Sequence, residues 1–251
     1  MTKVTQLERK HLDLFQENMN VASSSPASHL PAPDAIHALP LRERVEYEVD
    51  DVLRSLPDIA AMTAEQRRGV IARYTAVLEG NFIYWMTATL LSVKTEKARA
   101  IIVENLREEI RDCHPGMMRR FALAAGAAPN EGDALAVHAD LTKVRLFLGR
   151  LLPVPNLVTM AFFEGFIQRF MAYLADLARR QGSSEMEYTD VHGVCDITHT
   201  EELFHALEAE LSAASPAPET DLFEGVYLLR NLLRSVIHAD PLAASGASHA
   251  N

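Results

Sequence analysis

The sequence predicts an all-α protein, a bundle of helices around one core. Hydrophobic residues make up 48% of the 251-residue chain, which is ample for such a core. Ala, Leu, Glu and Arg, which favour helices, are abundant, and there are only 11 Gly. The alternation of Val and Ile that is typical of half-buried strands is absent. We therefore expect one helical domain over residues 41–240.

Outside that domain the composition changes. Residues 1–40 are expected to form an N-terminal arm, in which residues 1–20 could make a short helix. Residues 22–34 are rich in Ser, Pro and Ala, as in a linker. Residues 241–251, which end in ASGASHAN, are expected to be a flexible tail.

Within the domain, proline and capping residues set the expected helix boundaries. Pro57 ends the first helix, and Thr63 with Gln66 forms a capping box that starts the second. Pro115 disfavours helix at His114, so the chain is expected to break or kink there. The expected helices cover residues 41–56, 63–93 and 95–113, a stretch ending at Gly126, and residues 131–150, 155–181, 186–212 and 219–238.

Charge and cysteine content argue against several classes of protein. The net charge of −10 argues against nucleic-acid binding, because phosphates require a basic face. Two cysteines, Cys113 and Cys195, do not make a disulfide framework. Residues 1–20 are charged and lack the apolar segment of a signal peptide, and the long apolar stretches carry Glu. We expect a cytoplasmic protein with no nucleic-acid or membrane partner.

The spacing His192-x3-Asp196-x2-His199 is the first indication of a metal site. Steps of four and seven residues place Asp196 and His199 within about 40° of His192, on one helical face. Imidazole and carboxylate donors without a thiolate favour iron or manganese over a structural zinc. Taken singly, each of these residues would more often lie at the surface or cap a helix.

Two acids stand alone in apolar runs. Glu164 is the only charged residue from Leu151 to Gln168, and Glu79 is the only one from Tyr74 to Val93. A carboxylate buried without a partner costs several kcal/mol or more, so it must be protonated, paired or bound to a metal. For Glu164 the alternative is a buried acid that is paired or neutral. For Glu79 it is an acid at a helix surface.

The segment ENLREEIRDCHPGM supplies a further histidine and further acids. His114 lies ten residues after Glu104, within about 80° of it on a straight helix, so we favour Glu104 as the ligand. Glu108, about 120° away on the same count, is the alternative. Glu108 and Asp112 are also expected to orient ligand histidines by hydrogen bonding. The remaining charges are expected to form a solvated face.

These residues resemble the haem-oxygenase-like diiron oxidases and oxygenases. The resemblance covers about residues 60–238. It rests on Glu104…His114, on Glu164, on His192-x3-Asp196-x2-His199, and on the phrase HPGM followed by RRFALAAG. It implies a haem-oxygenase-like bundle of about seven core helices without haem, usually a homodimer. It also implies two iron ions that activate O2, with electrons from an external donor.

Within this family, the resemblance implies N-oxygenation of a small-molecule amine. The N-oxygenases have an extra carboxylate on the preceding core helix, and Glu79 lies 25 residues before Glu104. The alternatives are a diiron oxidase for C–C cleavage or desaturation, and a metal-free thiaminase-like hydrolase that uses Cys. The iron ligands implied for the N-oxygenase are Glu79, Glu104, His114, Glu164, His192, Asp196 and His199.

Overall fold

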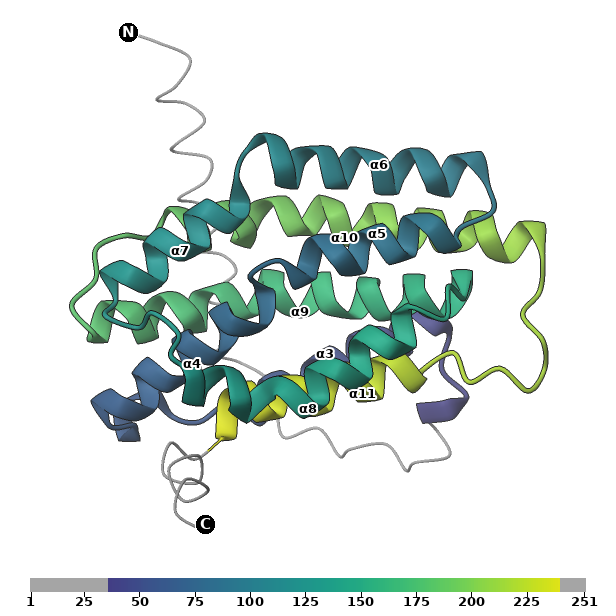
Figure 1. Ribbon diagram of the computed structural model, residues 1–251. Coiled ribbons are helices and arrows are strands. Elements are labelled where there is room, and N and C mark those ends of the chain that lie inside the picture. The colour runs from purple at the N-terminus through teal and green to yellow at the C-terminus, as the bar shows by residue number, and fades with distance from the viewer. Residues whose placement is uncertain (1–35, 240–251) are drawn as a thin grey trace, which may run out of the picture. The chain divides into compact units, whose positions relative to one another are not determined.

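The computed structural model describes residues 36–239, and the regular secondary structure of that part consists of helices alone, as the sequence predicts (Figure 1). Residues 1–35 of the expected arm over 1–40, and the expected tail over 241–251, lie outside the described residues. No helix in the described part is both long and apolar enough to cross a membrane. The bundle helices are α3 Leu41–Arg54, α4 Ala64–Leu78, α5 Asn81–Ser92, α6 Glu96–Arg111, α7 His114–Ala124, α8 Glu131–Leu148, α9 Pro153–Arg180, α10 Glu187–Ala213 and α11 Glu224–His238, with a short 3-10 turn at Ile59–Ala61.

Helix α9 is the centre of the bundle. It runs through the middle of the ribbon in Figure 1 and packs against α3, α4, α5, α10 and α11. Most of its side chains from Val154 to Ala178 are buried, on every side of the helix. A helix that is hydrophobic all round belongs in a core, which explains why the apolar run of the sequence has no solvent face. A charged side chain between Val154 and Ile167 therefore meets a dry environment, whereas Arg169 and Asp176, farther along α9, reach solvent.

The expected single helix from Thr63 to Val93 is wrong, because two helices fill this range. The capping box of Thr63 and Gln66 is present and starts α4. Helix α4 ends at Leu78, and Gly80 between α4 and α5 has φ +79°. Glycine adopts this left-handed conformation without the steric cost of a Cβ, so the chain can turn between two apolar helices.

The expected break at His114-Pro115 is present. Cys113 has φ +57°, and α7 starts at His114 with Pro115 in its first turn. A left-handed non-glycine residue is uncommon, and it redirects the chain between α6 and α7. The angle of 100° per residue that relates side chains within one helix therefore cannot be carried across Cys113.

A buried carboxylate ties α6 to α10. Glu210 Oε1 accepts hydrogen bonds from the backbone N–H of Lys94, at 2.9 Å, and from the N–H and hydroxyl of Thr95, at 2.7 and 2.8 Å. The negative charge also suits the N-terminal end of α6. Since α6 begins beside the end of α10, the two helices run antiparallel, which places the C-terminal turns of α6 beside the first half of α10.

Close packing of α11 on α8 and α9 depends on Gly225. A Cβ at this position would lie 2.1 Å from Thr159 Oγ1 and 2.3 Å from Phe147 Cε1. Gly225→Ala is therefore expected to lower the free energy of unfolding by about 2 kcal/mol or more, because the core must shift to admit one methyl group. Urea unfolding measures the effect. Gly165→Ala is the control, since its Cβ would have only ordinary contacts from 3.7 Å outward, and an equal loss in both variants would contradict this account.

Candidate metal centre

Helix α10 presents one buried polar face. His192, Asp196 and His199 are 5%, 1% and 2% exposed, and all three lie on the side of α10 that faces the core. Steps of four and seven residues produce this arrangement because the helix is continuous from Glu187 to Ala213. Three donor side chains in adjacent turns need partners inside the bundle.

Glu164 supplies a carboxylate from the central helix. It is 1% exposed, and its Oε1 has no hydrogen-bond partner among residues 36–239. Burial, reinforced by the negative charge of Asp196, raises the pKa of Glu164 well above its ordinary value. The α9 carboxylate and the α10 face thus approach each other in the core.

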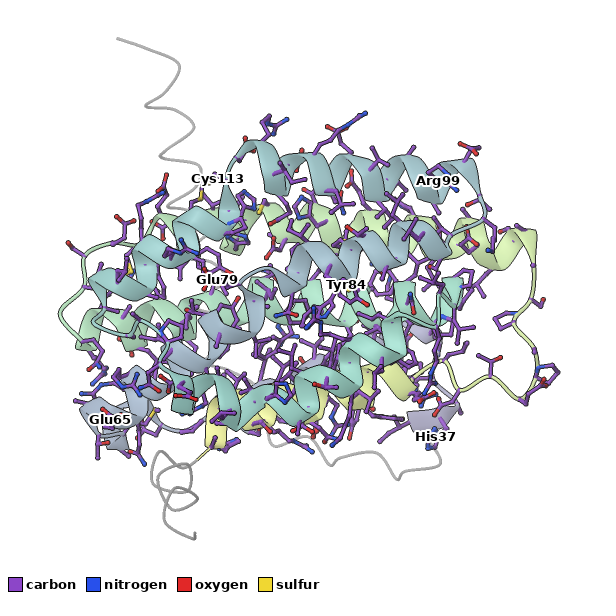
Figure 2. The ribbon with its side chains drawn as sticks, viewed as in Figure 1. His37, Glu65, Glu79, Tyr84, Arg99 and Cys113 are labelled. Atoms are coloured by element: carbon purple, nitrogen blue, oxygen red, sulfur yellow. The ribbon has the colours of Figure 1, made fainter. Side chains whose placement is uncertain are left out.

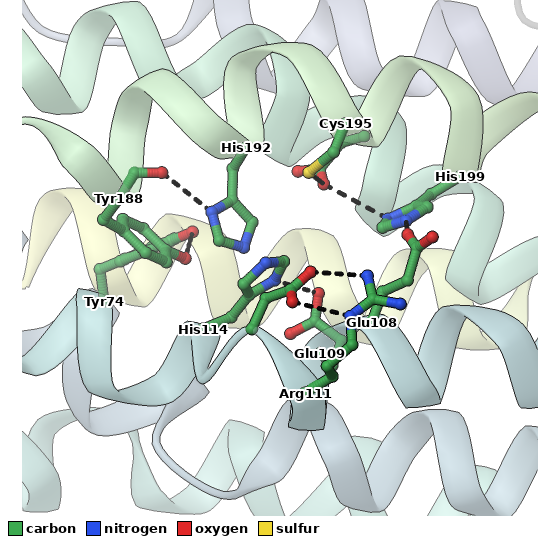
Figure 3. A network of polar contacts seen from close by, with 11 residues as sticks. Tyr74, Glu108, Glu109, Arg111, His114, Tyr188, His192, Cys195 and His199 are labelled. Carbon is green, nitrogen blue, oxygen red and sulfur yellow. Dashed lines mark hydrogen bonds and ion pairs between the residues drawn. The ribbon is translucent and has the colours of Figure 1, made fainter.

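The break between α6 and α7 brings in two further side chains. Glu109, near the end of α6, and His114, at the start of α7, are both 4% exposed. The His114 Nδ1–H donates to Glu109 Oε1 at 2.7 Å. The His114 and His192 ring centroids are 4.5 Å apart, so this pair joins the α10 face directly (Figure 3).

Glu109 was not among the residues favoured from the sequence, although a signal for it exists. The buried positions of α6 are Ala98, Ile102, Asn105, Leu106 and Glu109. These follow the helical stripe i, i+4, i+7, i+8 and i+11, so Glu109 occupies a position on the apolar stripe. An acid on such a stripe is the same kind of signal as Glu164 in its apolar run.

The structure places Glu104 outside the buried cluster. Its side chain is 54% exposed and pairs with Arg107 on the solvent side of α6, with 3.3 Å between Arg107 Nη1 and Glu104 Oε2. The angular count from Glu104 to His114 crossed Cys113, where the helix is broken. Glu109, on the buried side of α6, is the acid that lies beside His114 in this structure.

Of the two acids expected to orient ligand histidines, Glu108 contacts a histidine and Asp112 does not. Glu108 Oε2 accepts a hydrogen bond from His199 Nε2–H at 2.9 Å. Asp112 instead pairs with Arg111 at the surface, with 2.8 Å contacts from both Nε and Nη2. Glu108 therefore holds the Nε2 edge of the His199 ring, and the Nδ1 of His199 is directed into the core.

Glu79 lies outside the buried cluster. It forms the C-cap of α4, its side chain is 39% exposed, and it pairs with Arg119 on α7. Figure 2 shows Glu79 near the junction of α4 and α5. The expectation that Glu79 joins the other ligand candidates is not met in this arrangement, because Gly80 ends α4 and leaves the side chain of Glu79 at the bundle surface.

The candidate donors, which are all buried except the half-buried Cys195, fall into two neighbouring groups. The first consists of Glu109, His114 and His192, and the second of Cys195, Asp196 and His199. Within each group the candidate donor atoms lie within 4.8 Å of one another. The charges of Asp196, His199 and Glu109 all act on Glu164, so Glu164 lies close to members of both groups. Two triads with a carboxylate beside them could hold two metal ions.

Hydrogen bonds fix the orientation of two histidine rings. The His192 Nδ1–H donates to the backbone oxygen of Tyr188 at 2.9 Å, which leaves Nε2 directed to the cluster. His199 uses Nε2 for Glu108, and its buried Nδ1 has no hydrogen-bond partner within the described chain. Metal-bound histidines characteristically hold their second ring nitrogen in this way.

The unsatisfied atoms of the cluster fit a cation. Glu164 Oε1, Asp196 Oδ2 and His199 Nδ1 are all buried and lack hydrogen-bond partners among residues 36–239. Buried polar atoms normally have partners, and leaving them unpaired is costly. All three are metal-ligand atoms, and their nitrogen and oxygen chemistry suits iron. The residues present therefore fit a metal centre.

A small cavity opens onto the first triad. It has a volume of about 20 Å³, enough for about one water molecule. Glu109, His114, Glu164 and His192 line one side. The other walls, apart from Tyr188, are apolar: Leu78, Phe82 and Ile83 come from α4 and α5, Pro115 and Met118 from α7, and Ile167 from α9.

The comparison with protein families identifies the kind of protein. A profile described as iron-containing redox enzyme matches residues 71–233, well over half of the chain. The chain belongs to this family. The match confirms the resemblance to haem-oxygenase-like diiron proteins, and the helical bundle agrees with it. A comparison with curated protein sequences found no significant match. This iron-containing redox enzyme thus has a buried cluster of suitable donors in the matched region.

Because Glu109 is buried beside His114 and Glu104 is exposed, substitutions at these two positions are expected to affect iron affinity differently. Glu109→Gln is expected to weaken Fe(II) binding by about tenfold or more, because a buried carboxylate beside His114 is lost. Glu104→Gln is expected to leave the affinity unchanged, because Glu104 contacts only Arg107 at the surface. Anaerobic Fe(II) titration of both variants measures the difference. The reverse ranking would return Glu104 to the centre.

The metal-free protein is expected to lose stability as pH rises from about 6.5 to 10. Burial alone lowers the pKa of His199, but the carboxylates of Asp196, Glu164 and Glu108 outweigh it and raise the pKa to about 10. A raised folded pKa contributes stability that is complete below the unfolded value and lost as pH rises through the folded one. The loss is up to about 1 kcal/mol per pH unit.

Urea unfolding of the metal-free protein at several pH values tests this expectation. His199→Gln should flatten the dependence over the same range, because the titrating group is gone. An equal slope in the wild type and in His199→Gln would show that other groups cause the change.

Proposed function

We propose that this chain is a non-haem diiron oxygenase that uses O2 to oxidise the amine nitrogen of a small metabolite. The observation that carries the proposal is the pair of buried donor triads with Glu164 beside them. Their buried nitrogen and oxygen atoms without hydrogen-bond partners among the described residues would be satisfied by cations, and the family is one of iron-containing enzymes. Two ions rather than one are supported by the number of donors, since the nitrogen- and oxygen-bearing side chains in and beside the triads supply six ligand groups.

The proposed ligands are Glu109 and His114 from the α6–α7 break, Glu164 from α9, and His192, Asp196 and His199 from α10. Bound iron would supply the activation of O2, with electrons from an external reductant. The chain itself orients His192 through Tyr188 and His199 through Glu108. The bundle interior keeps bulk water away from these groups.

The apolar cavity walls support a neutral amine as substrate. Leu78, Phe82, Ile83 and Met118 line the space beside the first triad. An apolar environment disfavours the charged form of an amine and so preserves the nitrogen lone pair that must react. The tight volume also excludes water from the reacting nitrogen.

Substrate entry is proposed to pass between α7 and the turn that joins α4 to α5. A cavity for about one water molecule must widen to accept an organic amine. Glu79 and Arg119 form an ion pair across these two elements, next to the wall residues Leu78 and Met118. An exposed ion pair contributes little stability, so its opening costs little.

Oxidative C–C cleavage or desaturation of an amino or fatty acid is the second candidate. Two observations favour it. Glu79, the residue whose resemblance to an N-oxygenase ligand implied oxidation of nitrogen, lies at the surface. The apolar cavity walls also suit an aliphatic chain. The thiaminase-like hydrolase has less support. Cys195 donates to Asp196 among the metal-ligand candidates, and Cys113 is exposed at the helix break.

Oxygen labelling distinguishes the two oxidative reactions. Metal-free protein is loaded anaerobically with two equivalents of Fe(II), then mixed with oxygen-18-labelled O2, a reductant and a panel of small amines, amino acids and fatty acids. The expected result is labelled oxygen on an amine nitrogen, lost in Glu164→Gln and retained in Glu104→Gln. Shortened or unsaturated carbon products would establish the second candidate. Iron loading without O2 consumption under any condition would reject both.

A further inference from the structure

Cys195 lies in the second donor group, four residues before His199, so these two side chains share one face of α10. Neighbouring residues on a helix point about 100° apart, so Cys195 and Asp196 would be expected to diverge. Instead the Cys195 thiol donates a hydrogen bond to Asp196 Oδ1, with 3.2 Å between Sγ and Oδ1. Its sulfur lies within 4.8 Å of the Asp196 and His199 donor atoms (Figure 3).

The two other members of this group have unused ligand atoms. Asp196 Oδ2 and His199 Nδ1 are buried and have no hydrogen-bond partner in the part of the chain that the structure describes. Asp196 and His199 are only 1% and 2% exposed. A thiol, a carboxylate and an imidazole therefore lie together, and the carboxylate and the imidazole each have a ligand atom without a hydrogen-bond partner among the described residues.

We propose that Cys195 Sγ is a ligand of the second metal position, together with Asp196 and His199. This inference rests on the proposed metal centre and adds a residue to it. The first position has two imidazoles and the carboxylate of Glu109, whereas the second has one thiolate, one carboxylate and one imidazole. The two positions are therefore chemically unequal, and the second is the softer.

Ligation exchanges one bond for another without any change of oxidation state. The Cys195 S–H bond breaks, its proton leaves to solvent, and a sulfur–metal bond forms with the thiolate pair. Asp196 Oδ1 loses the hydrogen bond from the thiol at the same time, and Asp196 becomes free to bind through either oxygen. Softer divalent ions such as Co(II), Zn(II) and Cd(II) should enter the second position first.

Cobalt titration tests the inference, and the chain provides its own control. Co(II) is added to metal-free wild-type protein, Cys195→Ser, Cys195→Ala and Cys113→Ser, while near-ultraviolet absorbance and bound cobalt are both recorded. Cys113 is exposed and lies outside both donor groups. We expect a thiolate-to-cobalt band that saturates at one equivalent, is lost in both Cys195 variants and is retained in Cys113→Ser.

The outcomes separate this inference from the proposed function. Two equivalents of bound cobalt without a thiolate band would reject Cys195 as a ligand and leave the metal centre in place. A band that persists in both Cys195 variants, or disappears in Cys113→Ser, would also reject it. No bound cobalt in the folded wild-type protein would reject the inference together with the metal centre. Circular dichroism of each metal-free variant verifies that the helices are retained.

Discussion

The structure depends on the cost of placing carboxylates in a helical core. Glu109, Glu164 and Asp196 are almost fully buried, and the charges of Glu109 and Asp196 act on Glu164. The hydrogen bonds of the described residues still leave Glu164 Oε1 and Asp196 Oδ2 unsatisfied. Histidines compensate part of this charge. Hydrophobic packing along α9 holds the acids in place despite their mutual repulsion. Such an arrangement is unfavourable for an interior without cations, which is why a metal centre accounts for it better than a structural role does.

The sequence predicted the parts of this site that lie within one unbroken helix. Spacing placed His192, Asp196 and His199 on one face because α10 is continuous, and the lone charge of Glu164 predicted its burial within α9. Counting residues along a helix did not predict side-chain positions where the chain leaves the helix, at Cys113 and Gly80. The choice of Glu104 used a helical count that passes through Cys113, and the expected helix through Glu79 ends just before it.

The missed residue shows what sequence reasoning can still recover. Glu109 shares the buried stripe of α6 with four other residues, so a count made only within α6 would have selected it over Glu104. The hydrogen bond from Cys195 to Asp196 is different in kind, because it joins neighbouring residues of a helix and depends on side-chain torsions that no spacing rule describes. The size of the cavity also depends on side chains from α4, α5, α7 and α9, and these come together only in the folded bundle.

The position of the α6–α7 break has a consequence for the unfolding of the whole bundle. His114 and Glu164 are separated by 50 residues, and α7 and α8 lie between them. Ions held jointly by the two sides would act as a reversible cross-link that closes this loop. By the entropy of loop closure, a permanent link of that length would be worth about 4 kcal/mol against the unfolded chain. The proposed centre would then fasten the helices of the chain to one another in addition to its chemical role.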